Sequence, residues 1–144
     1  MKTLSVLLFA LLFVLPAHAD PVAVAGTWLS GDGDGLIELR IDGNKLSAII
    51  LGSPNEDPDR PKTDIKNPDP ALRDRLLIGL DIFSGFSNDG DGKWSGGFIY
   101  DPNSGKTYRG KLKLKDHNTI KLRGYIGISL IGRTETWARQ TPEP

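Results

Sequence analysis

The sequence contains no cysteine, and its 144 residues include one Met and two His. Without cysteine the chain forms no disulfide, offers no thiol nucleophile and has no cysteine ligand for a metal. His18 falls in an N-terminal segment that we expect to be removed, so His117 is the one histidine left, which excludes a histidine-rich zinc site. Gly-x-Ser-x-Gly and phosphate-binding glycine motifs are also missing. We therefore expect neither a metal nor a cofactor.

The chain has no excess of charge, because 18 Lys and Arg balance 18 Asp and Glu. A near-neutral domain lacks the basic field of nucleic-acid-binding proteins, so we expect no nucleic-acid partner. Beyond Ala19 no apolar run reaches the length that spans a bilayer, so we expect no membrane-spanning segment.

Met1–Ala19 resembles a secretory signal peptide. Lys2 precedes the apolar run Leu4–Leu15, and Ala17-His18-Ala19 has small residues where a signal peptidase cuts. Removing these 19 residues leaves 125, with 17 basic and 18 acidic side chains. We expect export to the periplasm or secretion, one domain over 20–140, and a flexible tail over 141–144.

The rest of the chain has the pattern of an all-β protein, because apolar residues alternate with polar ones between turn sequences. Leu36–Ile41 and Tyr108–Lys115 alternate most clearly, and Asp42-Gly43-Asn44 is a hairpin signal. We predict about eight strands, near 24–30, 35–42, 45–52, 76–86, 93–100, 106–115, 118–126 and 128–139. An antiparallel meander of this length closes, or nearly closes, into a small barrel that is filled by side chains or holds one small ligand. Strand glycines such as Gly97, Gly110 and Gly124 indicate either tight bends or room for that ligand.

Ser53–Arg75 interrupts the meander with a long polar loop that holds five of the ten prolines. Asp69 followed by Pro70 predicts a capped short helix within it. The loop also carries a polar cluster, for which two interpretations stay open: its arginines bind a carboxylate or phosphate, or they pair with Asp69 or Asp74 while the other members cap turns. The cluster consists of Asp64, Asn67, Asp69, Arg73 and Arg75.

Two Asp-Gly runs, 31–35 and 89–92, resemble pieces of calcium loops. Placing Gly92 at the glycine position of an EF-hand puts Ser87 at position one and Phe98 at position twelve, so the bidentate acid is missing. We interpret both runs as turns between strands.

Trp28 and Trp137 lie in the first and last predicted strands, which are neighbours in a closed barrel. An arginine from the last strand, Arg133 or Arg139, stacked on a tryptophan would close one end. We expect these four residues to contribute to barrel closure.

Short motifs spread over most of the chain resemble the bacterial domain of unknown function 2147. They are Gly26-x-Trp28, Asn67-Pro68-Asp69, Arg73, Leu77-x-Gly79, Trp94-x-Gly96-Gly97, Tyr100-Asp101-Pro102, Gly105-Lys106-x-Tyr108, Arg123-Gly124-Tyr125 and Gly132-Arg133-x-x-x-Trp137. The resemblance implies a small exported protein with a lipocalin-like barrel and no established activity. Members often carry a cysteine before the Asn-Pro-Asp element, where this chain has Thr63-Asp64, so a thiol role is not implied here.

Three functions compete. The first is a binding module for a small hydrophobic or amphipathic molecule, with the long loop as a lid. Its candidate ligand-binding residues are Asn67, Asp69, Arg73, Tyr100, Tyr108 and Arg123. The second is a non-catalytic envelope interaction or structural protein with a filled barrel, in which Lys111, Lys113, Lys115 and Lys121 could meet an acidic partner; the sequence identifies no protein partner. The third is an enzyme using Tyr100, Asp101, Tyr108 and Arg123, and the scarcity of His and Cys makes it the weakest.

Overall fold

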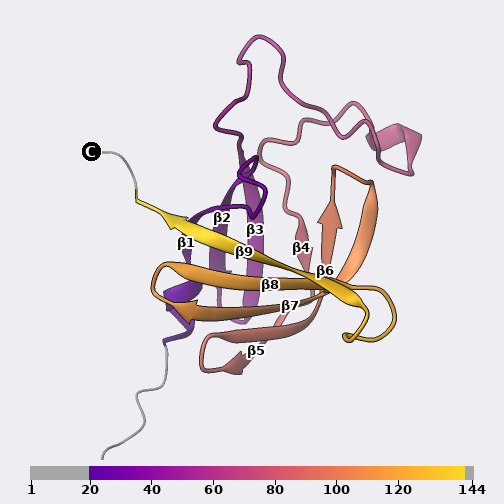
Figure 1. Ribbon diagram of the computed structural model, residues 1–144. Helices are drawn as coiled ribbons and strands as arrows, with labels where there is room; N and C mark the ends of the chain where they lie inside the picture. The colour runs from indigo at the N-terminus through magenta and orange to yellow at the C-terminus, as the bar shows by residue number, and fades with distance from the viewer. Residues whose placement is uncertain (1–19, 142–144) are drawn as a thin grey trace, which may run out of the picture.

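Antiparallel strands, joined by short turns except at the long loop before β4, form one sheet that curls around on itself (Figure 1). The computed structural model describes residues 20–141, so the predicted signal peptide and residues 142–144 lie outside the described chain. The nine strands are β1 (Gly26–Leu29), β2 (Leu36–Asp42), β3 (Lys45–Gly52), β4 (Phe83–Ser84), β5 (Ser87–Gly90), β6 (Lys93–Asp101), β7 (Lys106–Asp116), β8 (Thr119–Tyr125) and β9 (Gly132–Gln140).

The strand order is β3-β2-β1-β9-β8-β7-β6-β4, and β5 pairs with β6. Neighbours follow the chain except at two places: β4 pairs with β6, and β1 pairs with β9, which joins the two ends of the chain. The predicted all-β antiparallel meander is therefore confirmed.

The segment before β4 brings the two edges of the sheet together without a regular strand. Gly79 N donates to Ile50 O at 2.8 Å, and Ile82 N donates to Ala48 O at 2.9 Å. Between them Asp81 Oδ1 accepts a hydrogen bond from Ala48 N at 2.9 Å. These bonds close the barrel between β3 and β4.

The strand predicted over 76–86 is wrong in extent, because regular pairing covers just the two residues of β4. Beside β3 the Asp81 carboxylate, and not a main-chain carbonyl, accepts the hydrogen bond from Ala48 N. The pattern of apolar and polar residues in the sequence does not indicate such a side-chain bond. The last strand also begins at Gly132 rather than near 128, after a loop over 126–131.

The predicted short helix is a 3-10 turn, η2 (Pro70–Leu72). Its cap is as expected, since the Asp69 side chain accepts a hydrogen bond from Ala71 N and Pro70 occupies the first position. A second 3-10 turn, η1 (Pro21–Val24), precedes β1. Over residues 20–141 no helix has the length and apolar character to cross a membrane.

The hydrophobic core fills one end of the barrel. Trp28 is fully buried and its Nε1 donates to Val24 O at 2.9 Å, so η1 plugs this end. Phe86 lies so close to Gly97 and Gly110 that a Cβ at either would meet its ring within 2.6 Å. These two glycines make room for a side chain of the protein, not for a ligand. The other buried core residues are Ile37, Leu39, Leu46, Ala48, Ile82, Phe83, Trp94, Leu112, Ile120, Leu122 and Trp137.

Candidate functional site

The other end of the barrel contains a cavity of about 280 Å³. Its wall is formed where β1, β3, β6 and β8 end and where β2, β7 and β9 begin. Six strands, β2, β3, β6, β7, β8 and β9, contribute between one and three lining residues each, and the connecting loops supply the rest. The barrel is thus filled at one end and hollow at the other.

The inner wall of the cavity is mostly apolar. Gly124 on β8 adds to the space, because it carries no side chain where Leu122 and Trp137 line the wall beside it. The other apolar lining residues are Ile37, Ile50, Leu77, Ile78 and Ile99, and Tyr100 and Tyr108 add aromatic surface.

The rim is polar and predominantly acidic. Five lining carboxylates, Asp32, Asp34, Glu56, Asp101 and Glu135, face two lining cations, Lys62 and Arg133. Lys62 Nζ lies 3.5 Å from Asp34 Oδ2, and Arg133 Nη2 lies 3.7 Å from Glu135 Oε1. Both cations of the described lining therefore already face a carboxylate.

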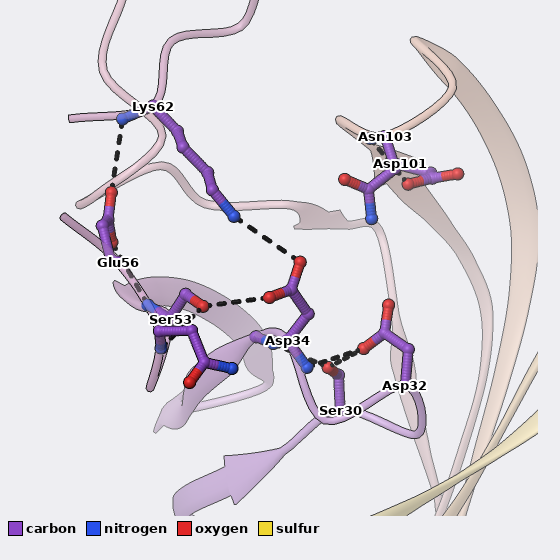
Figure 2. Close-up of polar contacts among 10 residues, drawn as sticks. Ser30, Asp32, Asp34, Ser53, Glu56, Lys62, Asp101 and Asn103 are labelled. Carbon is purple, nitrogen blue, oxygen red and sulfur yellow. Dashed lines mark hydrogen bonds and ion pairs between the residues drawn. The ribbon is translucent and has the colours of Figure 1, made fainter. Parts of the chain in front are cut away.

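The β1–β2 loop positions one part of this rim (Figure 2). Asp32 Oδ1 accepts hydrogen bonds from Ser30 Oγ at 2.5 Å and from Asp34 N at 3.1 Å. Ser30 Oγ in turn accepts one from Gly35 N at 2.9 Å. The serine hydrogen bond is the largest cause that lowers the pKa of Asp32, so this carboxylate is ionised at neutral pH.

The long loop is attached to the same rim. Ser53 Oγ donates to Asp34 Oδ1 at 3.1 Å, and Glu56 accepts from Ser53 N at 3.2 Å and Lys62 N at 3.3 Å. Figure 2 shows this group facing Asp101 and Asn103 across the opening. These contacts hold the rim carboxylates in place before any ligand arrives.

Asp64 joins the long loop to the barrel at Tyr100. Its side chain is fully buried; Oδ1 accepts from Tyr100 Oη at 2.5 Å, and Oδ2 accepts from Arg75 Nε at 2.9 Å. Burial favours the neutral acid, but hydrogen bonds from Tyr100, Asn67 and Arg75 outweigh it and lower the pKa of Asp64. Burial and the Asp64 carboxylate raise the pKa of Tyr100 to about 12.

The structure brings Tyr100 and Tyr108 together on the cavity wall, but it places the other candidate ligand-binding residues elsewhere. Asn67 is buried, and its Nδ2 donates to Asp64 Oδ2 at 2.8 Å. Arg73 Nε donates to Asn67 O at 2.8 Å. Asp69 is exposed and caps η2. A ligand role for Asn67, Asp69 and Arg73 stays a prediction.

Arg123 also lies away from the cavity. Its Nε donates to Ser129 O at 2.7 Å and its Nη1 donates to Thr134 Oγ1 at 2.8 Å, so it supports the β8–β9 loop. Its ligand role likewise stays a prediction.

The structural interpretation of the loop cluster is wrong about the partners of the arginines. Arg75 pairs with Asp64 at 2.8 Å and Arg73 with a main-chain carbonyl, whereas we expected pairing with Asp69 or Asp74. The reason is burial: Asp64 is enclosed by the loop and needs a cation, whereas Asp69 and Asp74 are exposed to water.

The expected arginine–tryptophan contact lies at the filled end. The Arg139 guanidinium carbon lies 4.2 Å from the centre of the Trp28 ring, and the same group donates to Ala23 O, Ala25 O and His117 O. Trp137 stacks on Phe83 at 6.2 Å in the core. Arg133 lies instead at the open end and lines the cavity.

The acidic rim was missed as a site because its members lie in unlike parts of the sequence: the β1–β2 turn, the long loop, the end of β6 and the interior of β9. Asp32 and Asp34 belong to an Asp-Gly run that we interpreted as a turn, and the β1–β2 loop does turn there. Within residues 20–141 no group of three or more His, Cys, Asp or Glu side chains is arranged to hold a metal ion. The signal that was available is position: Asp32, Asp34 and Asp101 lie at or next to strand ends that share one end of a closed meander.

Comparisons with known proteins agree with this architecture. A family model described as an uncharacterized protein conserved in bacteria (DUF2147) matches residues 26–139. Among solved structures, the chain is similar to protein HP1028 from Helicobacter pylori, described as belonging to the lipocalin family, with a TM-score of 0.75 and 22% identity over 83% of this chain and 84% of that one. This similarity shows a lipocalin-like fold. No curated protein matches the chain.

Proposed function

Because the chain belongs to the bacterial family DUF2147, described as uncharacterized, we propose its function from the cavity: it binds a small molecule with an apolar body and a head group that donates hydrogen bonds. The observation that carries this proposal is the cavity of about 280 Å³, apolar inside and acidic at its rim. Such a lining is typical of small-ligand sites, and the volume lies at the lower limit of their usual range, about 300 Å³.

The apolar wall of the cavity supports an apolar body for the proposed ligand. Burying apolar ligand surface against Ile50, Ile99 and Leu122 is favourable by roughly 25 cal/mol per Å² removed from water. At the other end of the barrel Trp28 and Trp94 fill the interior. The alternative of an entirely filled barrel is therefore disfavoured.

The rim explains the head group. Carboxylates accept hydrogen bonds and attract positive charge, so an ammonium or hydroxyl head fits between Asp34 on one side and Asp101 on the other. An acidic head would meet the same carboxylates, because Lys62 and Arg133 already face Asp34 and Glu135.

A fluorescent probe tests both parts. N-phenyl-1-naphthylamine, which brightens in apolar sites, is expected to bind the protein and to be displaced by octylamine. Octanoate, with nearly the same tail and the opposite charge, should need at least about a tenfold higher concentration, since tenfold corresponds to 1.4 kcal/mol. Equal competition by the two contradicts the proposed head group, and no probe binding contradicts the cavity as a ligand site.

Export is a separate part of the proposal and is supported by the sequence of Met1–Ala19 alone. The mass of the protein recovered from the periplasm of an expressing bacterium is expected to equal that of residues 20–144. A full-length protein confined to the cytoplasm contradicts it.

A further inference from the structure

The loop between β8 and β9 exposes four large aliphatic side chains in succession. Ile126, Ile128, Leu130 and Ile131 are 65%, 59%, 86% and 71% exposed. Single exposed aliphatic residues are ordinary on protein surfaces, but a contiguous group of this size marks an interaction site.

The loop is held in this shape by its neighbours. Ile131 N donates to Ile128 O at 3.1 Å, which makes a turn at the tip. Ser129 is bonded to β8 and β7 through Arg123 Nε at 2.7 Å and Lys111 Nζ at 3.4 Å. The aliphatic side chains therefore project from a loop whose middle is fixed to two basic strands.

Those strands carry a row of positive charges on their outer face. Leu112 and Leu122 pair across the sheet and are buried, so the residues that alternate with them point outward. The pairs Lys111–Arg123 and Lys113–Lys121 lie directly opposite each other. The outward basic residues of β7 and β8 are Arg109, Lys111, Lys113, Lys115, Lys121 and Arg123.

Like charges directly opposite each other destabilise a sheet, so this arrangement is costly for the isolated domain. No Asp or Glu stands among the outward residues from Thr107 to Lys115 on β7 or from Thr119 to Tyr125 on β8. Phe98 on β6 is 42% exposed beside Arg109, whose guanidinium carbon lies 5.7 Å from its ring centre. The face therefore combines cations, an aromatic ring and an adjoining aliphatic loop.

We propose that the 126–131 loop and the basic face of β7 and β8 form a docking surface for an anionic lipid bilayer. An aliphatic loop inserts among acyl chains while nearby lysines and arginines contact anionic headgroups, which is how peripheral segments bind membranes. A bilayer is favoured over an acidic protein because the four aliphatic side chains are 59% to 86% exposed on a loop that adjoins the cations of β7 and β8, so apolar groups and cations meet the acyl and headgroup layers of one surface. This proposal does not depend on a ligand in the cavity.

Docking of this kind places the cavity mouth beside the membrane. The loop starts just after Gly124 and ends just before Arg133, and both of these residues line the cavity. An apolar ligand would then have a short path between the bilayer and the barrel.

Sedimentation with vesicles tests the proposal. The experiment uses residues 20–144, which contain every described strand and core residue. We expect this protein to sediment with vesicles of equal parts phosphatidylglycerol and phosphatidylcholine and to stay in solution with pure phosphatidylcholine. Binding should weaken as salt is raised, because ions screen the headgroup attraction.

Paired variants locate the surface. Leu130→Ser with Ile131→Ser should reduce vesicle binding at least tenfold, whereas Ile65→Ser with Leu76→Ser, at side chains 64% and 53% exposed on the long loop, should leave it unchanged. Lys113→Gln should weaken binding about fivefold, in line with the contribution of one cation near an anionic surface, while Arg60→Gln on the long loop should have no effect. Circular dichroism melting of each variant separates lost binding from lost folding.

A tryptophan at the loop tip gives a second measurement. The three native tryptophans are buried, so Leu130→Trp adds an exposed reporter whose emission should move to shorter wavelength with anionic vesicles alone. The proposal is overturned if the unsubstituted protein ignores anionic vesicles, binds neutral ones equally well, or binds them as well after the loop substitutions. Binding to poly-glutamate without binding to vesicles would also overturn it and assign the face to an acidic protein.

Discussion

Asp64 shows how one residue joins a long loop to a barrel. It is fully buried, yet it accepts hydrogen bonds from Tyr100, Asn67 and Arg75, so both carboxylate oxygens have partners. A buried carboxylate without them would be costly, and the loop can fold over it because they are all present. The rim of the cavity therefore depends on a residue that does not line it.

The first residue-scale prediction concerns Tyr100. Its pKa is raised to about 12, so the phenol is neutral up to high pH and its contribution to stability is present below the unfolded value near 10. That contribution is lost as pH rises from 10 toward 12. Absorbance titration should show a late tyrosine ionisation that is lost in Tyr100→Phe. A late step that persists in the variant would contradict the assignment.

The second residue-scale prediction concerns Asp64→Asn. The folded pKa of Asp64 is lowered, so its contribution to stability is present above the unfolded value near 3.9 and is lost as pH falls through the folded value. At pH 7 the variant should lose about 2 kcal/mol, because charged hydrogen bonds become neutral ones. Urea unfolding at several acidic pH values should show a flatter pH dependence for the variant. Asp69→Asn, at an exposed cap, is the control and should keep the dependence of the unsubstituted protein.

At the scale of the element, β9 connects the two ends of the barrel. Its first residues reach the open cavity through Arg133, and its end reaches the filled core through Arg139. The same strand pairs with β1 and so joins the two ends of the chain. A substitution at the Arg139 end of this strand should therefore lower the stability of the fold, whereas one at the Arg133 end should leave it nearly unchanged.

Arg139→Ala and Arg133→Ala form a matched pair for this prediction. Arg139 covers Trp28 and bonds three carbonyl groups, so its loss should cost about 2 kcal/mol and lower the melting temperature by several degrees. The Arg133 side chain is 81% exposed, so its loss should change the melting temperature little. Calorimetry or circular dichroism measures both. Equal losses would contradict the assignment of Arg139 to barrel closure.

The sequence predicts some elements well because one physical signal determines them. Along residues 108–115 of β7 and 119–123 of β8, more buried residues alternate with more exposed ones, and this alternation is visible directly in the sequence. The segment over 76–86 fails this rule because closure there uses the Asp81 carboxylate and isolated main-chain bonds. The partners of Arg73 and Arg75 were also missed, because burial of Asp64 is a property of the folded loop and not of its local sequence.

At the scale of the whole molecule, a near-neutral chain separates its charge. Carboxylates gather at the cavity rim, while cations cover the outer face of β7 and β8. The closed meander was predictable from strand count and turns, but the cavity was not, since its wall takes between one and three residues from each of six strands and the rest from the connecting loops. The sequence also does not show what occupies the space beside the strand glycines. Phe86 packs against Gly97 and Gly110, whereas Gly124 lines the cavity.

The most direct test of the central claim is to fill the cavity from Gly124. A Cβ there would lie 3.5 Å from Tyr108 Cβ, an ordinary contact, so Gly124→Leu should fold and occupy the space proposed for the ligand. Ala138→Leu is the control, because Ala138 is exposed on β9. Titration with N-phenyl-1-naphthylamine should give at least about tenfold weaker binding for Gly124→Leu, a loss of 1.4 kcal/mol or more, and unchanged binding for Ala138→Leu. Equal binding by a folded Gly124→Leu protein would contradict the account.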